Sequence, residues 1–129
     1  MSWVRVMVAN YLGTDGQSWS DTFAIENGGT YNNQWFVVDM KKFVPDQPLA
    51  PGLLWVLEQI PGYIHSADQT AFLTKMGYWP SYNAPFYEDI ANRSGMIGAW
   101  KTAPRHFLFA RNATMVHDLE TFGNLMRCK

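Results

Sequence analysis

The chain has 129 residues, enough for one compact domain, and 47% of them are hydrophobic while only 16% are charged. Its ten Lys and Arg residues are balanced by eleven Asp and Glu residues, and the longest basic run is Lys41-Lys42. The charge therefore argues against nucleic acid and anionic membrane surfaces as partners. The low charge content favours a chain that normally lies against more protein.

The N-terminal third predicts two short helices. Residues 3–12 are apolar at helical spacing and are stopped by the glycine-containing run 13–16, although their valine content also permits a strand. A second helix over 18–25 would begin at Ser18 as its N-cap and end at Asn27-Gly28-Gly29.

Two apolar, β-branched runs follow, at 34–40 and 53–60. Their proximity in sequence predicts an antiparallel pair. Neither run alternates apolar with polar residues, which indicates a sheet covered on both faces. The fold class expected is α+β, with helices layered on this sheet.

The second half predicts more helices around one irregular segment. Ser66 would cap a helix over 66–76 that ends at Gly77, and residues 78–85 hold two prolines, which indicates an extended loop. A short helix is expected over 86–92, and a longer one over 114–127.

The single cysteine, Cys128, lies next to the C-terminus, so the chain cannot form an internal disulfide or a multi-thiolate metal site. Arg5 interrupts the N-terminal apolar run, so no signal peptide is expected, and no run reaches the roughly 18 apolar residues of a membrane span. Two Asn-x-Ser/Thr triplets, at Asn92 and Asn112, indicate glycosylation and a secretory route.

The runs 29–35 (Gly-Thr-Tyr-Asn-Asn-Gln-Trp), Val38-Asp39 and 57–62 (Leu-Glu-Gln-Ile-Pro-Gly) strongly resemble the phospholipase B-like family, also called lamina ancestor-like proteins. Four further runs occur in the same order as in the animal members: 3–10, 77–83, 103–105 and 125–127. Matches in order over nearly the whole chain are more specific than any one motif.

This resemblance implies an N-terminal-nucleophile hydrolase with an αββα sandwich, made as a glycosylated secretory or lysosomal precursor and matured by cleavage. The new N-terminal Cys would be the nucleophile, with its own α-amino group as general base. Cys128 lies near the wrong end for this role. The chain is therefore expected to be an internal fragment of the large chain, inactive alone, whose partner is the rest of the phospholipase B-like chain.

The complete protein would cleave ester or amide bonds of lipid-type small-molecule substrates, and no metal or organic cofactor is implied. The oligomeric state stays open. By resemblance, the catalytic residues in this chain are Asn83, as an oxyanion-hole donor, and Arg105, which would hold a substrate anion or steady the nucleophile. From the residues alone, Asn83 is a turn residue between two prolines and Arg105 a surface arginine. The stretch 96–103 is shorter than in relatives.

A rival hypothesis is a noncatalytic carbohydrate- or lipid-binding domain. It predicts exposed, coplanar aromatic side chains on one surface, drawn from Trp35, Trp55, Trp79 and Trp100. The hydrolase hypothesis predicts instead that Asn83 and Arg105 converge on one cavity.

Other polar residues are interpreted as structural. Asn32 and Asn33 would turn the chain into the strand that follows. His65, His106 and His117 lack metal-ligand spacing and are taken as structural or surface residues.

Overall fold

A three-stranded antiparallel sheet lies at the centre of the chain, whose residues 1–127 are described by a computed structural model. The strands are β1 (Gln34–Val38), β2 (Leu54–Ile60) and β3 (Tyr63–Asp68), in the order β1-β2-β3. The predicted antiparallel pairing of the first two strands is confirmed, with Phe36 opposite Val56. The central strand is thus β2.

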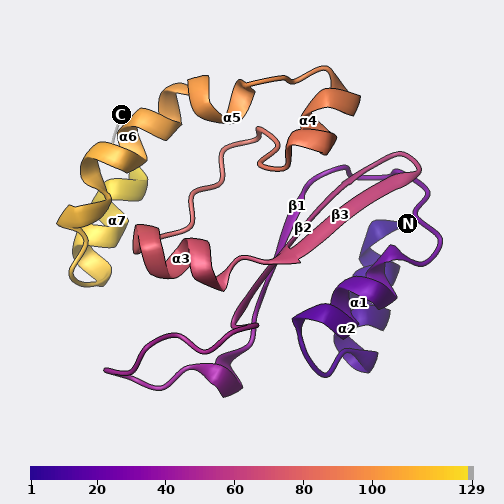
Figure 1. The fold of residues 1–129 in the computed structure, drawn as a ribbon, viewed down its shortest axis with the longest axis horizontal. Coiled ribbons are helices and arrows are strands. Elements are labelled where there is room, and N and C mark those ends of the chain that lie inside the picture. The colour runs from indigo at the N-terminus through magenta and orange to yellow at the C-terminus, as the bar shows by residue number, and fades with distance from the viewer. Residues whose placement is uncertain (128–129) are drawn as a thin grey trace.

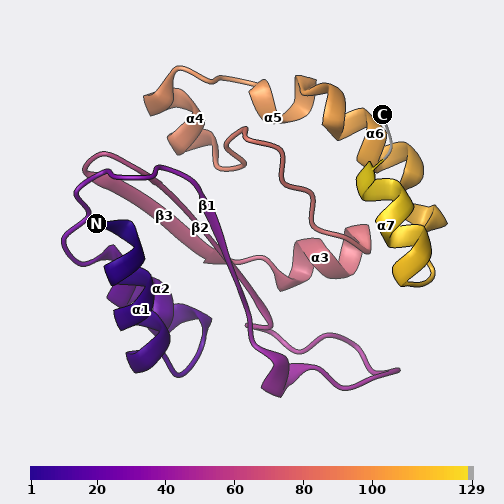
Figure 2. The same cartoon turned by 180° about the vertical axis from the view of Figure 1, so that it is seen from behind.

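Helices lie on both sides of this sheet (Figures 1 and 2). One face carries the antiparallel pair α1 (Ser2–Leu12) and α2 (Gly16–Ala24), which confirms the helix expected over 3–12. From the end of β3, the chain continues on the other side through the remaining helices, which are α3 (Thr70–Met76), α4 (Glu88–Ser94), α5 (Ala99–Thr102), α6 (Pro104–Asn112) and α7 (Leu119–Arg127). Two short 3-10 turns are η1 (Met40–Lys42) and η2 (Ala113–Met115).

The central strand β2 is buried on both faces because successive side chains point to opposite sides of a strand. Leu54 and Val56 pack with Tyr87 in one apolar cluster. Leu57 packs with Phe23 in a second cluster beneath α1 and α2. The absence of alternation in β2 therefore has the physical cause expected from the sequence.

The sequence also predicts that β1 is covered on both faces. This prediction is wrong, because Phe36 and Val38 are exposed. An edge strand has a neighbour on one side only. Its apolar residues therefore meet fewer covering groups than those of β2.

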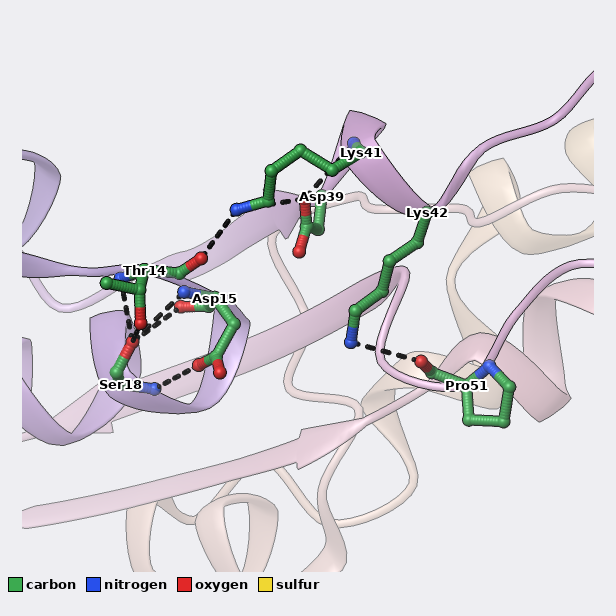
Figure 3. Close-up of polar contacts among 7 residues, drawn as sticks. All are labelled: Thr14, Asp15, Ser18, Asp39, Lys41, Lys42 and Pro51. Carbon is green, nitrogen blue, oxygen red and sulfur yellow. Dashed lines mark hydrogen bonds and ion pairs between the residues drawn. The ribbon is translucent and has the colours of Figure 1, made fainter.

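The helix α2 begins two residues before the expected position. Asp15 is the N-cap, because its carboxylate accepts a hydrogen bond from the Ser18 backbone N–H at 2.8 Å, and the Ser18 hydroxyl accepts one from the Asp15 N–H at 3.1 Å (Figure 3). Ser18 is therefore the third helical residue of a capping box and not the N-cap.

Two lysines hold the loop after β1 in place. The ammonium of Lys41 donates to the Thr14 carbonyl at 2.6 Å, and that of Lys42 donates to the Pro51 carbonyl at 3.2 Å (Figure 3). The first contact ties this loop to the turn between α1 and α2.

The helix predicted from Ser66 is wrong over its first four residues, because Ser66 lies in β3 and pairs with Leu57. Pairing with the buried β2 outweighs the local cap signal. The helix starts at Thr70, where the Asp68 carboxylate accepts the Thr70 N–H at 2.9 Å. Its predicted end at Gly77 is confirmed, and that glycine is left-handed, with φ of 76°.

The segment 78–85 has no helix or strand, as expected, and the short helix after it is α4. The helix expected over 114–127 begins only at Leu119, and α5 and α6 were not predicted. The α+β class is confirmed. Cys128 lies outside the described residues, and within them no helix is long and apolar enough to cross a membrane.

Candidate active site

A pocket of about 520 Å³ opens where the sheet, the proline-bounded loop and α4 meet. Its polar lining comes from the turn before β1 and the start of β1, from β2, from the loop 78–87 and from α4. The polar residues are Asn32, Asn33, Gln34, Glu58, Gln59, Ser81, Asn83, Arg93 and Ser94. The remaining wall is apolar and includes Ile60, Ile90 and Met96.

Asn83 lies on this wall in a backbone conformation that few residue types adopt readily. Its φ is 59°, in the left-handed region, which asparagine tolerates better than most residues with a Cβ. This agrees with the expected role of Asn83 as a turn residue between two prolines. Asn83 is also one of the residues that line the pocket.

Arg105 reaches this asparagine from α6. Pro104 is the first residue of that helix, and Nη1 of Arg105 donates to the amide oxygen of Asn83 at 3.1 Å. The two residues singled out from the sequence thus lie together, although 22 positions separate them. Asn83 lines the pocket, whereas Arg105 contacts Asn83 and is not part of the lining.

Glu58 is the acid that the sequence analysis did not single out. Its side chain is 3% exposed, yet three donors surround the carboxylate: the Gln34 amide at 2.6 Å and the backbone N–H groups of Phe86 at 2.7 Å and Tyr87 at 3.1 Å. Burial raises the pKa of Glu58, and these hydrogen bonds oppose the rise. The available signal was a single charged residue in a strand that is otherwise uncharged and mostly apolar.

Gln59, the next residue on β2, holds the opposite loop. Its amide nitrogen donates to the carbonyls of Thr30 and Tyr31 at 3.0 and 2.9 Å, and its oxygen accepts from Arg5 at 3.1 Å. The pair Glu58 and Gln59 therefore fixes the two loops that form the polar wall of the pocket.

The family model described as Phospholipase B matches residues 1–129. The chain belongs to the phospholipase B family. It is 45% identical to Phospholipase B-like protein A of Dictyostelium discoideum and 47% identical to Putative phospholipase B-like 2 of Bos taurus, each over 98% of this chain.

The chain spans about a quarter of the length of these phospholipase B-like relatives, 24% of the first and 23% of the second. The alignments run over 136 and 138 residues, more than the 129 of this chain, so the relatives carry additional residues within the matched region. In this member of the family, α5 and Pro104 lead directly into the helix that presents Arg105.

A second polar cluster of this phospholipase B family member lies between β3 and α4. Oδ2 of Asp89 accepts the Tyr63 hydroxyl and contacts Nδ1 of His65, both at 2.7 Å, and the Arg93 guanidinium lies 4.1 Å from the Tyr63 ring centre. Burial acts to raise the pKa of Asp89, but the hydrogen bonds from Tyr63 and His65 outweigh it and lower the pKa. The sequence does not predict this His–Asp pair, because it does not predict the strand β3 on which His65 lies.

The other two histidines have structural surroundings. Nδ1 of His106 lies 2.7 Å from the hydroxyl of the buried Tyr82, and burial raises the pKa of that tyrosine. His117 is exposed, and its backbone N–H donates to the Thr121 hydroxyl at the start of α7.

The four tryptophans of the rival hypothesis do not form an exposed platform. All of them are half-buried: Trp35, Trp55, Trp79 and Trp100. The Trp79 ring centre lies 4.8 Å from that of Phe86, and the Trp35 ring centre lies 5.1 Å from that of Phe23. These rings serve as packing groups.

The two candidate glycosylation residues differ in surroundings. Asn92 is exposed on α4. Asn112 is half-buried at the end of α6, where its oxygen accepts from Nε of Arg111 at 3.0 Å.

Proposed function

We propose that this chain is part of a phospholipase B-like hydrolase that cleaves an ester or amide bond in a lipid-type substrate. The nucleophile is the thiol of an N-terminal Cys supplied by another part of the longer protein. Membership of the family and the pocket that Asn83 lines support this proposal. The sheet β1-β2-β3 would be part of the αββα sandwich.

The contact between Asn83 and Arg105 carries the proposal. Because Arg105 occupies the amide oxygen of Asn83, the amide is oriented, and its nitrogen donates no hydrogen bond within residues 1–127. A preoriented N–H donor on a pocket wall is what a developing oxyanion requires. Arg105 is therefore a positioning residue, which acts on the substrate through Asn83.

The reaction then follows ordinary acyl transfer. The free α-amino group takes the thiol proton, and the sulfur attacks the substrate carbonyl carbon. The carbonyl oxygen becomes an oxyanion that accepts from the Asn83 nitrogen. Collapse of this intermediate forms the thioester and expels the alcohol or amine, which takes up the proton, and water then hydrolyses the thioester.

The pocket wall suits a substrate that is part polar and part apolar. Ile60, Ile90 and Met96 provide a surface for hydrocarbon, and the same pocket is lined by the polar side chains of Asn32, Asn33 and Asn83. Burying hydrocarbon against apolar side chains is favourable by about 25 cal/mol per Å². This mixed lining supports a lipid-type substrate.

The localisation proposed is lysosomal or secreted. A sugar on the exposed Asn92 fits this route, and Asn112 is the second candidate. If both sites carry sugar in a secretory host, partial digestion with an N-glycosidase is expected to lower the apparent mass of the protein in two steps. Asn92→Gln and Asn112→Gln each remove one step.

The test uses a chimera in which residues 1–129 replace the matching segment of Phospholipase B-like protein A of Dictyostelium discoideum. Asn83→Ala is expected to lower kcat by about 100- to 1,000-fold on phospholipids or N-acyl amides, since one oxyanion donor is lost. Arg105→Met is expected to lower kcat less, because the amide remains but is no longer oriented. Full activity of Asn83→Ala would overturn the proposal.

The matched control is Arg111→Met, which removes an exposed arginine from the same helix. It is expected to leave kcat unchanged. A loss equal to that of Arg105→Met would show that the arginines of α6 act through general charge and not through Asn83.

A further inference from the structure

The loop that carries Asn83 is held at both ends by one pair of side chains on the sheet. At its beginning, Nε1 of Trp79 donates to the oxygen of Gln34 at 3.3 Å. At its end, the N–H groups of Phe86 and Tyr87 donate to Glu58.

The two holding residues are joined to each other. Gln34 and Glu58 are cross-strand partners of β1 and β2, and the amide nitrogen of Gln34 donates to Oε1 of Glu58 at 2.6 Å. Trp79, Gln34, Glu58 and the backbone at 86–87 thus form one hydrogen-bonded bracket. The residues between its ends, 80–85, have no regular secondary structure of their own.

A buried carboxylate is costly unless donors surround it, and here two of the donors are backbone groups of the loop. The cost of leaving Glu58 without them therefore favours the bracketed loop conformation. The left-handed turn at Asn83 is one that a residue with a Cβ does not favour, so its neighbouring segments must hold it, and the Glu58 contact holds the C-terminal side. Arg105 can orient the Asn83 amide only if the turn is in place.

We infer that Glu58 is a positioning residue of the site, whose carboxylate sets the loop conformation that presents Asn83. The inference rests on the oxyanion role proposed for Asn83.

The first test measures the loop directly in the 129-residue chain by amide hydrogen exchange. Glu58→Gln offers one oxygen to three donors and turns an NH₂ group toward a backbone N–H, so at least one bond is lost. The Phe86 and Tyr87 amides are expected to exchange about tenfold faster or more. Exchange at Leu57, on the same strand, is expected to change less.

A matched control and a second variant accompany this measurement. Glu88→Gln removes an exposed carboxylate from the same segment and should leave exchange at 86–87 unchanged. If Glu58→Gln does not fold, Gln34→Met removes both the Gln34 contact to Trp79 and its donation to Glu58 while keeping the carboxylate. Its expected signature is faster exchange across residues 79–86.

The second test measures kinetics in the chimera. Glu58→Gln is expected to lower kcat by about 10- to 100-fold, because a small misplacement of a donor costs rate, and to leave KM unchanged, because Asn83 acts on the oxyanion. A merely structural role for Glu58 would lower the amount of folded enzyme without changing kcat per folded molecule.

The outcomes separate this inference from the proposed function. Unchanged exchange at Phe86 and Tyr87 in Glu58→Gln overturns the inference, even if Asn83→Ala abolishes activity. Faster exchange with unchanged kcat per folded molecule also overturns it. Full activity of Asn83→Ala overturns the proposed function, whatever exchange shows.

Discussion

At the scale of residues, β2 carries a carboxylate and an amide at consecutive positions, Glu58 and Gln59, which point to opposite faces of the sheet. Glu58 is buried among donors, and burial raises its pKa above the ordinary value of 4.5. The folded state therefore binds this proton more tightly than the unfolded state does. It follows that protonation of Glu58 favours folding.

This sign predicts how stability depends on pH. The contribution of Glu58 to the free energy of unfolding is fully present below the ordinary pKa of 4.5 and is lost as the pH rises through the raised pKa. Urea unfolding at a series of pH values is expected to show this loss in the original chain and not in Glu58→Gln. Glu88→Gln should keep it, and an equal slope in all three proteins would contradict the assigned sign.

The sequence could identify part of this site and not the rest. Asn83 and Arg105 were found through resemblance, and the structure brings them into contact. The sequence predicts no role for Glu58, because its partners, Phe86 and Tyr87, lie 28 and 29 positions away. Hydrogen bonds across such separations leave no local pattern in a single sequence.

At the scale of elements, local pattern succeeded where it agreed with the tertiary environment. The run 3–12 forms a helix and 53–60 contains the central strand. Local pattern failed at Ser66. This residue type often caps a helix, but here it lies in β3, which pairing with β2 stabilises. The helix α6 was not predicted, although Pro104 at its first position is a local signal for a helix start.

The start of α2 gives an element-scale prediction. An added Cβ at Gly16 would lie 2.2 Å from Cδ1 of Trp55, so this glycine lets the helix approach β2. Gly16→Ala is expected to lower the free energy of unfolding by about 1–3 kcal/mol, in spite of the better helix propensity of alanine. Thermal or urea unfolding measures it.

Gly123→Ala is the matched control, because Gly123 lies inside α7 and an added Cβ would meet only the flexible end of Arg127. It is expected to be neutral or stabilising, by up to about 1 kcal/mol. Equal destabilisation by both substitutions would contradict the packing role of Gly16.

At the scale of the whole molecule, two apolar clusters on opposite faces of β2 form the core, while the outer side of α1 stays uncovered within the described residues. Trp3 and Met7 are each 61% exposed and Tyr11 is 89% exposed. Contiguous exposed apolar side chains favour association. The large share of apolar residues in the composition is explained partly by this surface.

We therefore expect the isolated chain to self-associate in a concentration-dependent way. Trp3→Lys with Met7→Lys should reduce this association, measured by sedimentation, with a change in unfolding free energy within about 0.5 kcal/mol. Gln17→Lys, which adds positive charge at an exposed polar position, should have little effect. Association unchanged by the double substitution would place the contact surface elsewhere.

The opposite orientation of Glu58 and Gln59 has a consequence for how the chain folds. If β2 paired with β1 one residue out of register, every side chain of β2 would exchange faces. Glu58 would then face the loop that needs an amide, and Gln59 the loop that needs a carboxylate. A mispaired sheet therefore cannot assemble the pocket, and the formation of the site reports that the strands have paired correctly.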